Sequence, residues 1–194
     1  MEQIISTEKK CSEDRIQKLE QDLVILEQRI KDLQQQDSVS IVCFSGEWDK
    51  LFAAFTIANG ALSLGKEVHM FFTFWGATAM RDEKGTPSKN KNISQKMLGW
   101  MLPKSIKSTH LSKMNFGGFG KKMMEQQMKK QNIDDLPTLM KQAKELGANF
   151  YCCDTSLQLL GFDCNELIEK DDTDWCGVSS FLSLALKSRV TLFI

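Results

Sequence analysis

The chain has 194 residues, of which 42% are hydrophobic and 26% are charged, as is typical of a globular domain with a full core. Its 25 basic and 25 acidic side chains cancel, but they are unevenly distributed along the chain. A basic segment can meet an anionic partner, a phosphate or a nucleic acid, and of these partners we expect no nucleic acid. The longest apolar stretch, residues 70–75, is too short to span a bilayer, and residues 1–10 lack the apolar run of a secretory signal.

Cysteine and histidine usage argues against a metal site. The six cysteines contain no CxxC pair, and the two histidines, His69 and His110, are far apart. We therefore expect a cytoplasmic protein with reduced cysteines and no bound cofactor or metal.

The first predicted element is a helix with heptad spacing. Residues Ile16, Leu23 and Ile30 occupy a positions, and Leu19, Leu26 and Leu33 occupy d positions. This pattern favours a parallel two-stranded coiled coil and hence a homo-oligomer, although packing of the helix on its own domain accounts for it equally well. We assign residues 1–37 to this helix and residues 38–194 to a separate α/β domain.

A strand, a helix and a second strand follow. Residues 39–44 form an apolar run that ends at Ser45-Gly46, residues 48–62 have apolar side chains at helical spacing, and residues 67–74 form the second apolar run. This order predicts a βαβ unit with parallel strands.

The middle of the chain is strongly basic. Residues 81–130 carry 12 basic and 3 acidic side chains, together with a glycine-rich stretch at Gly117-Gly118. The segment is either a mobile cover that docks an anionic partner or a lysine-rich solvated loop. Shorter helices are predicted near residues 93–102, 123–128 and 136–146.

We interpret the stretch from residue 149 to residue 161 as the functional centre of the protein. It predicts a buried strand that passes into a helix at Asp154, Thr155 and Ser156, which are residues favoured at helix N-termini. A cysteine at such a junction has a lowered pKa, and Cys153 is therefore a candidate nucleophile. Alternatively, Cys152 and Cys153 are small buried hydrophobic residues.

Together with a last strand at residues 190–194, these elements predict a three-layer, doubly wound α/β domain with a mostly parallel sheet. Ligands and chemistry in this architecture collect at the carboxyl ends of the strands. The residues that reach this edge are Ser45, Gly46, Trp75, Gly76 and Cys153.

Several segments resemble the DsrE/DsrF-like family, in particular its DsrE-like family two. They are FSGEWDK at residues 44–50, ANGA at 58–61 and VHMFFTFWG at 68–76, and the ending at residues 192–194 also fits. The resemblance covers nearly everything from residue 39 onward. The family's cysteine is the first residue of a motif of the form C-x-M-S-M-D-x-M-G. When the serine and the final glycine of this motif are aligned with Ser156 and Gly161, its cysteine corresponds to Cys153.

The resemblance implies an oligomeric protein that carries sulfane sulfur as a cysteine persulfide between donor and acceptor proteins or small sulfane-sulfur compounds. Cys153 is then the sulfur-carrying residue, and Cys152 lies in the core. The departures from the motif include residues 155, 157 and 158, where Thr, Leu and Gln replace Met, Met and Asp. The residues expected to assist Cys153 or to line the site are Cys43, Ser45, Gly46, Asp49, Lys50, Trp75, Gly76, Gly117, Gly118, Asp154 and Ser156.

Two other functions remain open at this point. A nucleotide- or flavin-binding module would hold a phosphate at Ser45-Gly46, but the stretch lacks a glycine-rich fingerprint and puts Glu47 where the phosphate would lie. In a non-catalytic oligomeric interaction protein, the cysteines would only fill the core.

Overall fold

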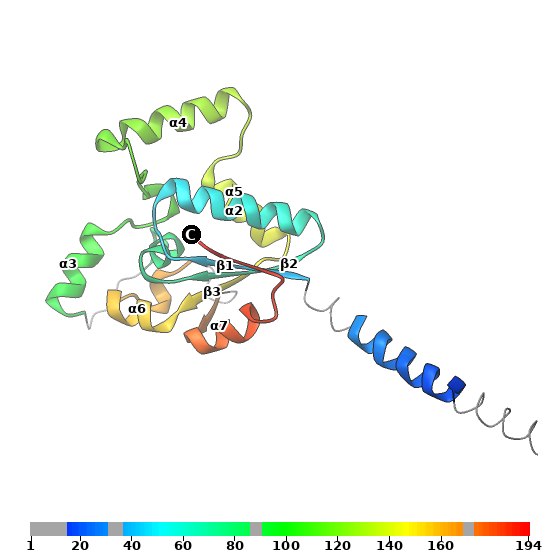
Figure 1. Ribbon diagram of the computed structural model, residues 1–194. Coiled ribbons are helices and arrows are strands. Elements are labelled where there is room, and N and C mark those ends of the chain that lie inside the picture. Colours follow the sequence, from blue (N-terminus) through cyan, green and yellow to red (C-terminus); the bar gives the residue numbers. More distant parts are fainter. Residues whose placement is uncertain (1–14, 31–36, 86–90, 169–172) are drawn as a thin grey trace, which may run out of the picture. The chain divides into compact units, whose positions relative to one another are not determined.

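The computed structural model of the protein describes residues 15–30, 37–85, 91–168 and 173–194, without the side chain of Cys164. The chain divides into two compact units, residues 1–37 and residues 38–194, which are described separately. The second unit, called the body below, contains the sheet (Figure 1).

The body is built on a five-stranded sheet in which every neighbouring pair is parallel. The strand order is β4-β3-β2-β1-β5. The strands are β1 (Ser38–Cys43), β2 (Glu67–Phe72), β3 (Asn149–Cys153), β4 (Thr173–Cys176) and β5 (Val190–Phe193). The chain thus steps outward from β1 to β4 and returns to the other side of β1 with β5.

Helices connect the strands. The α-helices of the body are α2 (Trp48–Ser63), α3 (Ile93–Met101), α4 (Phe119–Lys130), α5 (Leu136–Glu145), α6 (Asp154–Leu160) and α7 (Val178–Ala185). Within the described residues there are also four 3-10 helices, η1 (Phe74–Met80), η2 (Ile106–Ser108), η3 (Phe116–Gly118) and η4 (Cys164–Glu166). Helix α5 begins as its sequence predicts, with Asp135 accepting a hydrogen bond from the Thr138 backbone N–H at 3.0 Å.

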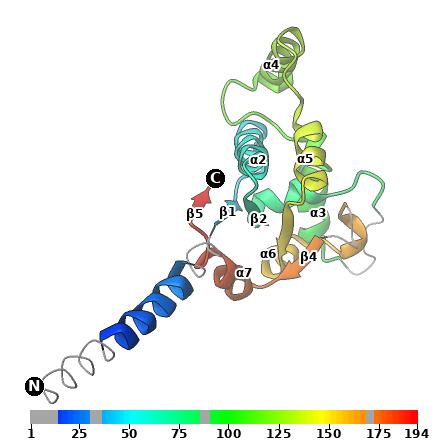
Figure 2. The same cartoon turned by 90° about the vertical axis from the view of Figure 1, so that its right-hand side faces the viewer.

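Three layers result, and they confirm the predicted doubly wound α/β fold. Helices α2 and α5 lie side by side over one face of the sheet, and α7 covers part of the other face (Figures 1 and 2). After β4 the chain reverses its direction along the sheet, and crossovers between parallel strands are right-handed. Among the described helices, α7 therefore crosses the face opposite to α2 and α5.

The two faces of the sheet differ in size and composition. Ile41, Met70 and Phe150 point toward α2 and α5 and belong to the large core. On the opposite face, Phe71 and Phe181 stack at a centroid distance of 4.5 Å within a small cluster under α7. Successive side chains of a strand point to opposite faces, and so each strand contributes to both clusters.

One strand was not predicted. Residues 173–176 form β4 and pair with β3. Strand β4 has only four residues, and its Asp174 and Trp175 are exposed. A strand this short and this polar has no clear apolar periodicity.

In the described part of the basic segment, residues 81–85 and 91–130, the helices α3 and α4 are largely exposed. None of the nine residues of α3 is buried, and α4 buries only Gly120 and Met128. The start of the segment differs, because the Lys91 ammonium forms an ion pair with the Glu166 carboxylate at 2.5 Å, and both side chains are buried. Ile106 and Thr109 are also buried, so the segment is fixed to the rest of the body at its start and in its middle, whereas α3 and α4 are largely exposed.

In the N-terminal unit, residues 15–30 are helical. This helix contains the heptad residues Ile16, Leu19, Leu23, Leu26 and Ile30, whereas Leu33 lies outside the described residues. The coiled coil stays a prediction. Within the described part of the chain, no helix combines the length and apolar character needed to cross a bilayer.

Candidate functional site

Cys153 lies where β3 ends and α6 begins. It is the last residue of the strand and the N-cap of the helix, with φ −71° and ψ 114°, so no loop separates the two elements. The helix begins without a capping hydrogen bond from a side chain, and Asp154 lies in its first turn, where the helix dipole favours a negative charge. The thiol therefore sits at the carboxyl edge of the sheet, as predicted.

The surroundings of Cys153 are a mixture of apolar and hydroxyl groups. The residue is only 2% exposed and packs with Phe71 and Phe181 beneath α7. On its other side, the Ser156 hydroxyl is 3.0 Å from the Thr73 hydroxyl and accepts a hydrogen bond from the Phe74 backbone N–H at 2.9 Å. These contacts tie the end of β2 to the start of α6.

These polar groups control the acidity of the thiol. Burial alone raises the pKa of Cys153, but hydrogen bonds from the Ser156 hydroxyl and N–H, the Thr73 hydroxyl and the Thr155 N–H outweigh it, and the pKa falls below its ordinary value. Donors aimed at a sulfur stabilise its thiolate form. Thr73 was not predicted as a site residue, although its position directly after the apolar run of β2 could have indicated it.

Phe74 adopts a backbone conformation that is uncommon for a residue with a side chain. Its φ is 51°, in the left-handed region. The hydrogen bond to Ser156 and stacking of its ring on Phe44, at a centroid distance of 5.4 Å, hold it there. Such conformations occur where the surrounding structure imposes them, often at functional sites.

The other described cysteines have different environments. Cys152 is fully buried in the large core, and burial raises its pKa to about 12. Cys43 lies in the same core, on the opposite face of the sheet from Cys153, and burial strongly raises its pKa. The structure therefore does not bring Cys43 to Cys153 as an auxiliary thiol, because alternation along β1 directs it toward α2.

The thiol that does lie next to Cys153 is that of Cys176, which our sequence analysis did not identify as a site residue. Cys176 ends β4, is half-buried, and pairs in register with Cys153. Burial, followed by the charges of Asp154, Cys153 and Asp174, raises its pKa to about 11. A second thiol thus lies beside the candidate nucleophile.

Several predicted residues gather in a separate cavity at the ends of β1 and β2. This cavity has a volume of about 360 Å³, and its lining includes Ser45, Gly46, Lys50 and Trp75. Among the described residues that line it, Cys153 does not occur. The segment from Thr73 to Gly76 lies between the two, and the predicted single site is in fact divided.

Gly46 and Gly76 allow two chain segments to approach closely. A side chain on Gly46 would meet the Trp75 carbonyl group and the Thr78 hydroxyl, and a side chain on Gly76 would overlap the Cys43 carbonyl oxygen. The close packing of these chain segments thus requires glycine at both positions.

The N-terminus of α2 is occupied by groups of the chain itself. The Glu47 carboxylate accepts a hydrogen bond from the Ser45 hydroxyl at 3.1 Å and forms an ion pair with the Lys50 ammonium at 2.8 Å. The Trp48 N–H donates to the His110 carbonyl oxygen at 2.7 Å. A phosphate at this helix end would meet a carboxylate, which argues against the nucleotide-binding alternative.

Three more predicted residues lie away from Cys153. The Asp49 carboxylate accepts hydrogen bonds from the Ser112 N–H and hydroxyl at 2.8 and 2.6 Å and so fixes a loop. Gly117 and Gly118, with φ of 66° and 96°, shape the turn that begins α4. Helix α4 lies on the α2 side of the body in both ribbon views, whereas α6 follows Cys153 (Figures 1 and 2). None of the three contributes to the surroundings of the thiol.

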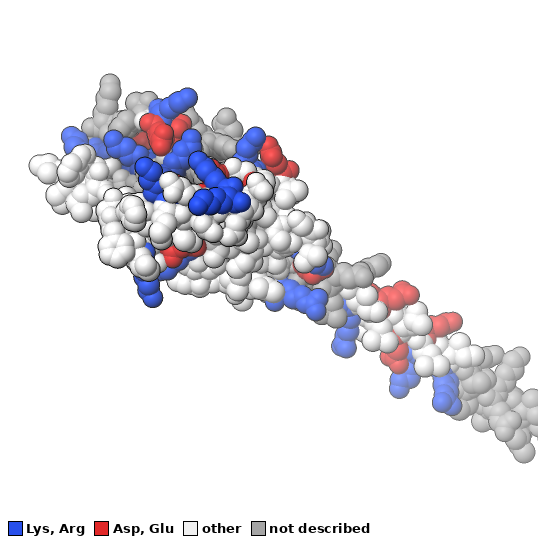
Figure 3. All heavy atoms as spheres, turned by 90° about the horizontal axis from the view of Figure 1, so that it is seen from above, with Lys and Arg blue, Asp and Glu red and all other residues white. Residues whose placement is uncertain are grey.

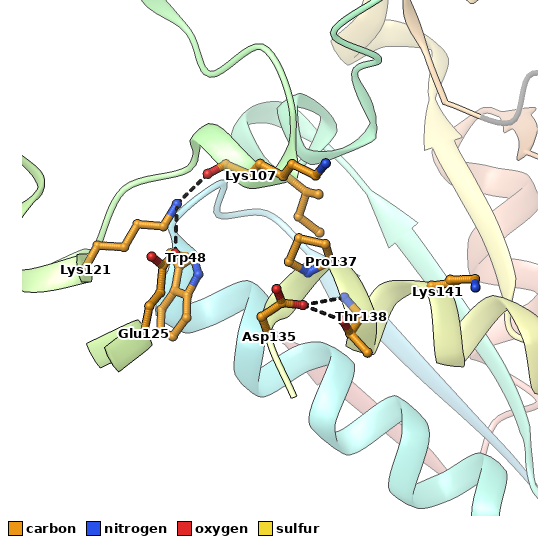
Figure 4. Close-up of a pocket in the computed structure, with 9 residues that line it drawn as sticks. Trp48, Lys107, Lys121, Glu125, Asp135, Pro137, Thr138 and Lys141 are labelled. Atoms are coloured by element: carbon orange, nitrogen blue, oxygen red, sulfur yellow. Dashed lines mark hydrogen bonds and ion pairs between the residues drawn. The ribbon is translucent and has the colours of Figure 1, made fainter. Parts of the chain in front are cut away.

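A further cavity, of about 390 Å³, lies between α4 and α5 (Figure 4). Lys107, Lys121 and Lys141 line it together with Glu125 and Asp135. The Lys121 ammonium donates to the backbone carbonyl oxygens of Lys107 and Thr109, which fastens α4 to the preceding loop. The described residues contain no cluster of three side chains suited to holding a metal ion.

Comparison with known proteins identifies the fold. The model of the DsrE/DsrF/DrsH-like family matches residues 35–193. The uncharacterized protein YrkE of Bacillus subtilis is 44% identical over 161 residues, which cover 83% of this chain and 99% of YrkE. The sulfur carrier protein DsrE2 of Allochromatium vinosum is 25% identical over 163 residues, which cover 82% of this chain and 99% of DsrE2. With its parallel sheet and a family match that spans the whole body, the chain belongs to the DsrE/DsrF/DrsH-like family.

Proposed function

We propose that this protein is a sulfur carrier or sulfurtransferase that holds sulfane sulfur as a persulfide on Cys153. The supporting observation is selectivity: among the described cysteines, only Cys153 has a lowered pKa, whereas burial raises the pKa of Cys43, Cys152 and Cys176. A relative named as a sulfur carrier favours the same role.

The chemistry follows from a stabilised thiolate. The Cys153 thiolate attacks the outer sulfur of a donor persulfide, the donor leaves as a thiolate, and Cys153 becomes Cys–S–SH. An acceptor thiolate then attacks the outer sulfur, and Cys153 is released as a thiolate. The hydrogen bonds from Ser156 and Thr73 stabilise Cys153 in both steps, as the attacking and as the leaving group.

Burial supplies the second requirement of a carrier, which is protection of the bound sulfur. With 2% exposure, Cys153 is covered by α7 through Phe181 and by the small cluster around it. Oxidation of a thiol depends on its thiolate character and on access of the oxidant to the sulfur, and burial restricts that access. Delivery and removal of sulfur require that these covering side chains move.

The basic segment supplies a docking surface for donor or acceptor proteins. Its exposed lysines alternate with exposed apolar side chains such as Trp100, Phe116 and Phe119. Lysine and arginine side chains gather on the body in the view from the α4 side, where acidic side chains are fewer (Figure 3). A basic surface of this kind attracts acidic partners and raises their association rate at low salt.

The test is sulfur loading of the full-length protein. We expect intact-mass spectrometry after incubation with tetrathionate or polysulfide to show one thiosulfonate group or one sulfur on the wild type. Cys153→Ser should lose this adduct. Cys152→Ala is the matched control, because it removes the adjacent thiol on the other face of the sheet.

Equal loading of Cys153→Ser and wild type would remove this mechanism. Mass spectrometry of the untreated native protein separates the alternatives, since a bound nucleotide or flavin would support the nucleotide-binding module. If the protein carries no adduct before loading and gains neither an adduct nor a disulfide after it, the non-catalytic interaction protein is the remaining alternative.

A further inference from the structure

Two cysteine thiols meet at the carboxyl edge of the sheet. Cys153 and Cys176 are the last residues of β3 and β4 and are direct register partners. Neighbouring strands lie about 4.8 Å apart. Disulfides usually join residues whose Cα atoms are about 4.4–6.8 Å apart, so the backbone spacing suits a covalent bond between these two residues.

Both side chains point to the same face. Cys153 belongs to the small cluster under α7, and Cys176 packs against that cluster. Cys43 and Cys152 belong to the large core on the opposite face. Among the described cysteines, therefore, only Cys176 shares a face with Cys153.

The two thiols are chemically unequal. Cys153 has the lowered pKa and is almost fully covered, whereas Cys176 is half-buried and has the raised pKa. The charge of Cys153 is itself one cause of that increase. Of the two reduced cysteines, Cys153 is thus the one that more readily becomes a thiolate, whereas Cys176 remains a neutral thiol.

We propose that Cys153 and Cys176 form a redox-active dithiol in which Cys176 resolves the sulfur-loaded Cys153 by closing a disulfide. The resolving step rests on the function proposed above. Cys176 loses its proton to solvent and its thiolate attacks the Cys153 sulfur of Cys153–S–SH. The bond to the outer sulfur breaks, and that sulfur leaves as hydrosulfide. The two cysteines are oxidised together by two electrons, and the sulfane sulfur is reduced to sulfide.

Closure of the same disulfide without bound sulfur needs an external two-electron oxidant. A diazene such as diamide serves, because it accepts the two electrons and two protons of the dithiol and becomes a hydrazine. Oxidation by diamide therefore tests whether Cys153 and Cys176 can form a disulfide, independently of any sulfur-carrying function.

The first experiment is diamide treatment of the reduced full-length protein, followed by peptide mapping. We expect a disulfide between the peptides that contain Cys153 and Cys176, at the stoichiometry of one per chain. Cys152→Ala should form it as the wild type does, because Cys152 faces the other core. Failure of the wild type to form this link would overturn the proposal.

The second experiment measures the lifetime of the sulfur adduct after polysulfide loading. Wild type should release hydrosulfide and gain the disulfide, while Cys176→Ser should keep its adduct at least about tenfold longer. Equal lifetimes would overturn the resolving role. If Cys153 takes up no sulfur in either protein, the sulfur-carrier function fails, and the diamide experiment alone decides whether the dithiol exists.

Discussion

At the scale of single residues, Ser156 is the centre of the polar contacts around Cys153. Its hydroxyl accepts the Phe74 N–H, lies 3.0 Å from the Thr73 hydroxyl and hydrogen-bonds to the Cys153 sulfur. One side chain therefore both fixes the backbone after β2 and lowers the pKa of the thiol.

We expect Ser156→Ala to raise the pKa of Cys153, because it removes the first of the hydrogen bonds that offset the effect of burial. Less thiolate is then present at neutral pH, and alkylation of Cys153 by iodoacetamide at pH 7 should slow by roughly three- to tenfold. The measurement is the alkylation rate of Cys153 as a function of pH, followed by peptide mass spectrometry.

The control is Thr155→Ala. Thr155 bonds to the thiol through its backbone N–H, which the substitution keeps. Its pH profile should match that of the wild type. If Ser156→Ala and wild type have the same profile, the hydroxyl does not set the acidity of Cys153.

The two thiols differ in how well the sequence indicates them. The position of Cys153 at a strand–helix junction was predictable, because an apolar strand runs directly into residues that are common at helix N-termini, which is a local signal. The position of Cys176 depends on the register between β3 and β4, which are separated by α6 and residues 161–172. No local pattern encodes that pairing, and so the partner thiol could not be predicted.

At the scale of elements, the segment from Thr73 to Gly76 crosses over the end of β1 at close range. The Gly76 N–H donates to the Phe44 carbonyl oxygen at 2.8 Å, and a side chain at Gly76 would overlap the Cys43 carbonyl oxygen. Because the obstacle is backbone, it cannot move without disturbing β1.

Gly76→Ala should lower the free energy of unfolding by about 2–3 kcal/mol, as is typical of overpacking. Gly60→Ala is the matched control: Gly60 lies exposed inside α2, with no atom near an added Cβ. That substitution should raise the free energy of unfolding by about 0.5–1 kcal/mol. Urea denaturation measures both, and a tolerated Gly76→Ala would contradict the close approach.

The sequence predicted most elements but not how well they are buried. Helix α3 was expected over residues 93–102 and occurs at Ile93–Met101, yet Ile93 and Trp100 are exposed. Helix α4 begins at Phe119, earlier than expected, because the positive φ values of Gly117 and Gly118 allow a tight turn just before it. Periodicity detects a helix, whereas burial depends on which other elements are close.

At the scale of the whole molecule, the heptad helix predicts self-association. Residues Ile16, Leu23 and Ile30 recur at a positions on the helix formed by residues 15–30. We expect the full-length protein to be a homo-oligomer, and deletion of residues 1–36 to reduce or loosen the assembly. Light scattering of both proteins at matched concentrations is the measurement.

A monomeric full-length protein would contradict this prediction. An unchanged oligomer after the deletion would instead locate the main interface in the body. Ile16→Asn with Leu23→Asn is a milder variant, since it places polar groups at the a positions while leaving the length of the chain unchanged.

Strands β1 and β5 are neighbours in the sheet but lie at opposite ends of the body's sequence. The hydroxyls of Ser38 and Ser188, which form a hydrogen bond beside these two strands, are 150 residues apart in the chain. While the protein is being synthesised, β1 and β2 can pair soon after both have left the ribosome. The outer edge of β1 must then wait, unpaired, until residues 190–193 emerge. An open strand edge is a template for pairing with other chains. Nascent chains on crowded polysomes are therefore at risk of joining one another through β1, and a chaperone that shields this edge would protect the protein until translation reaches β5.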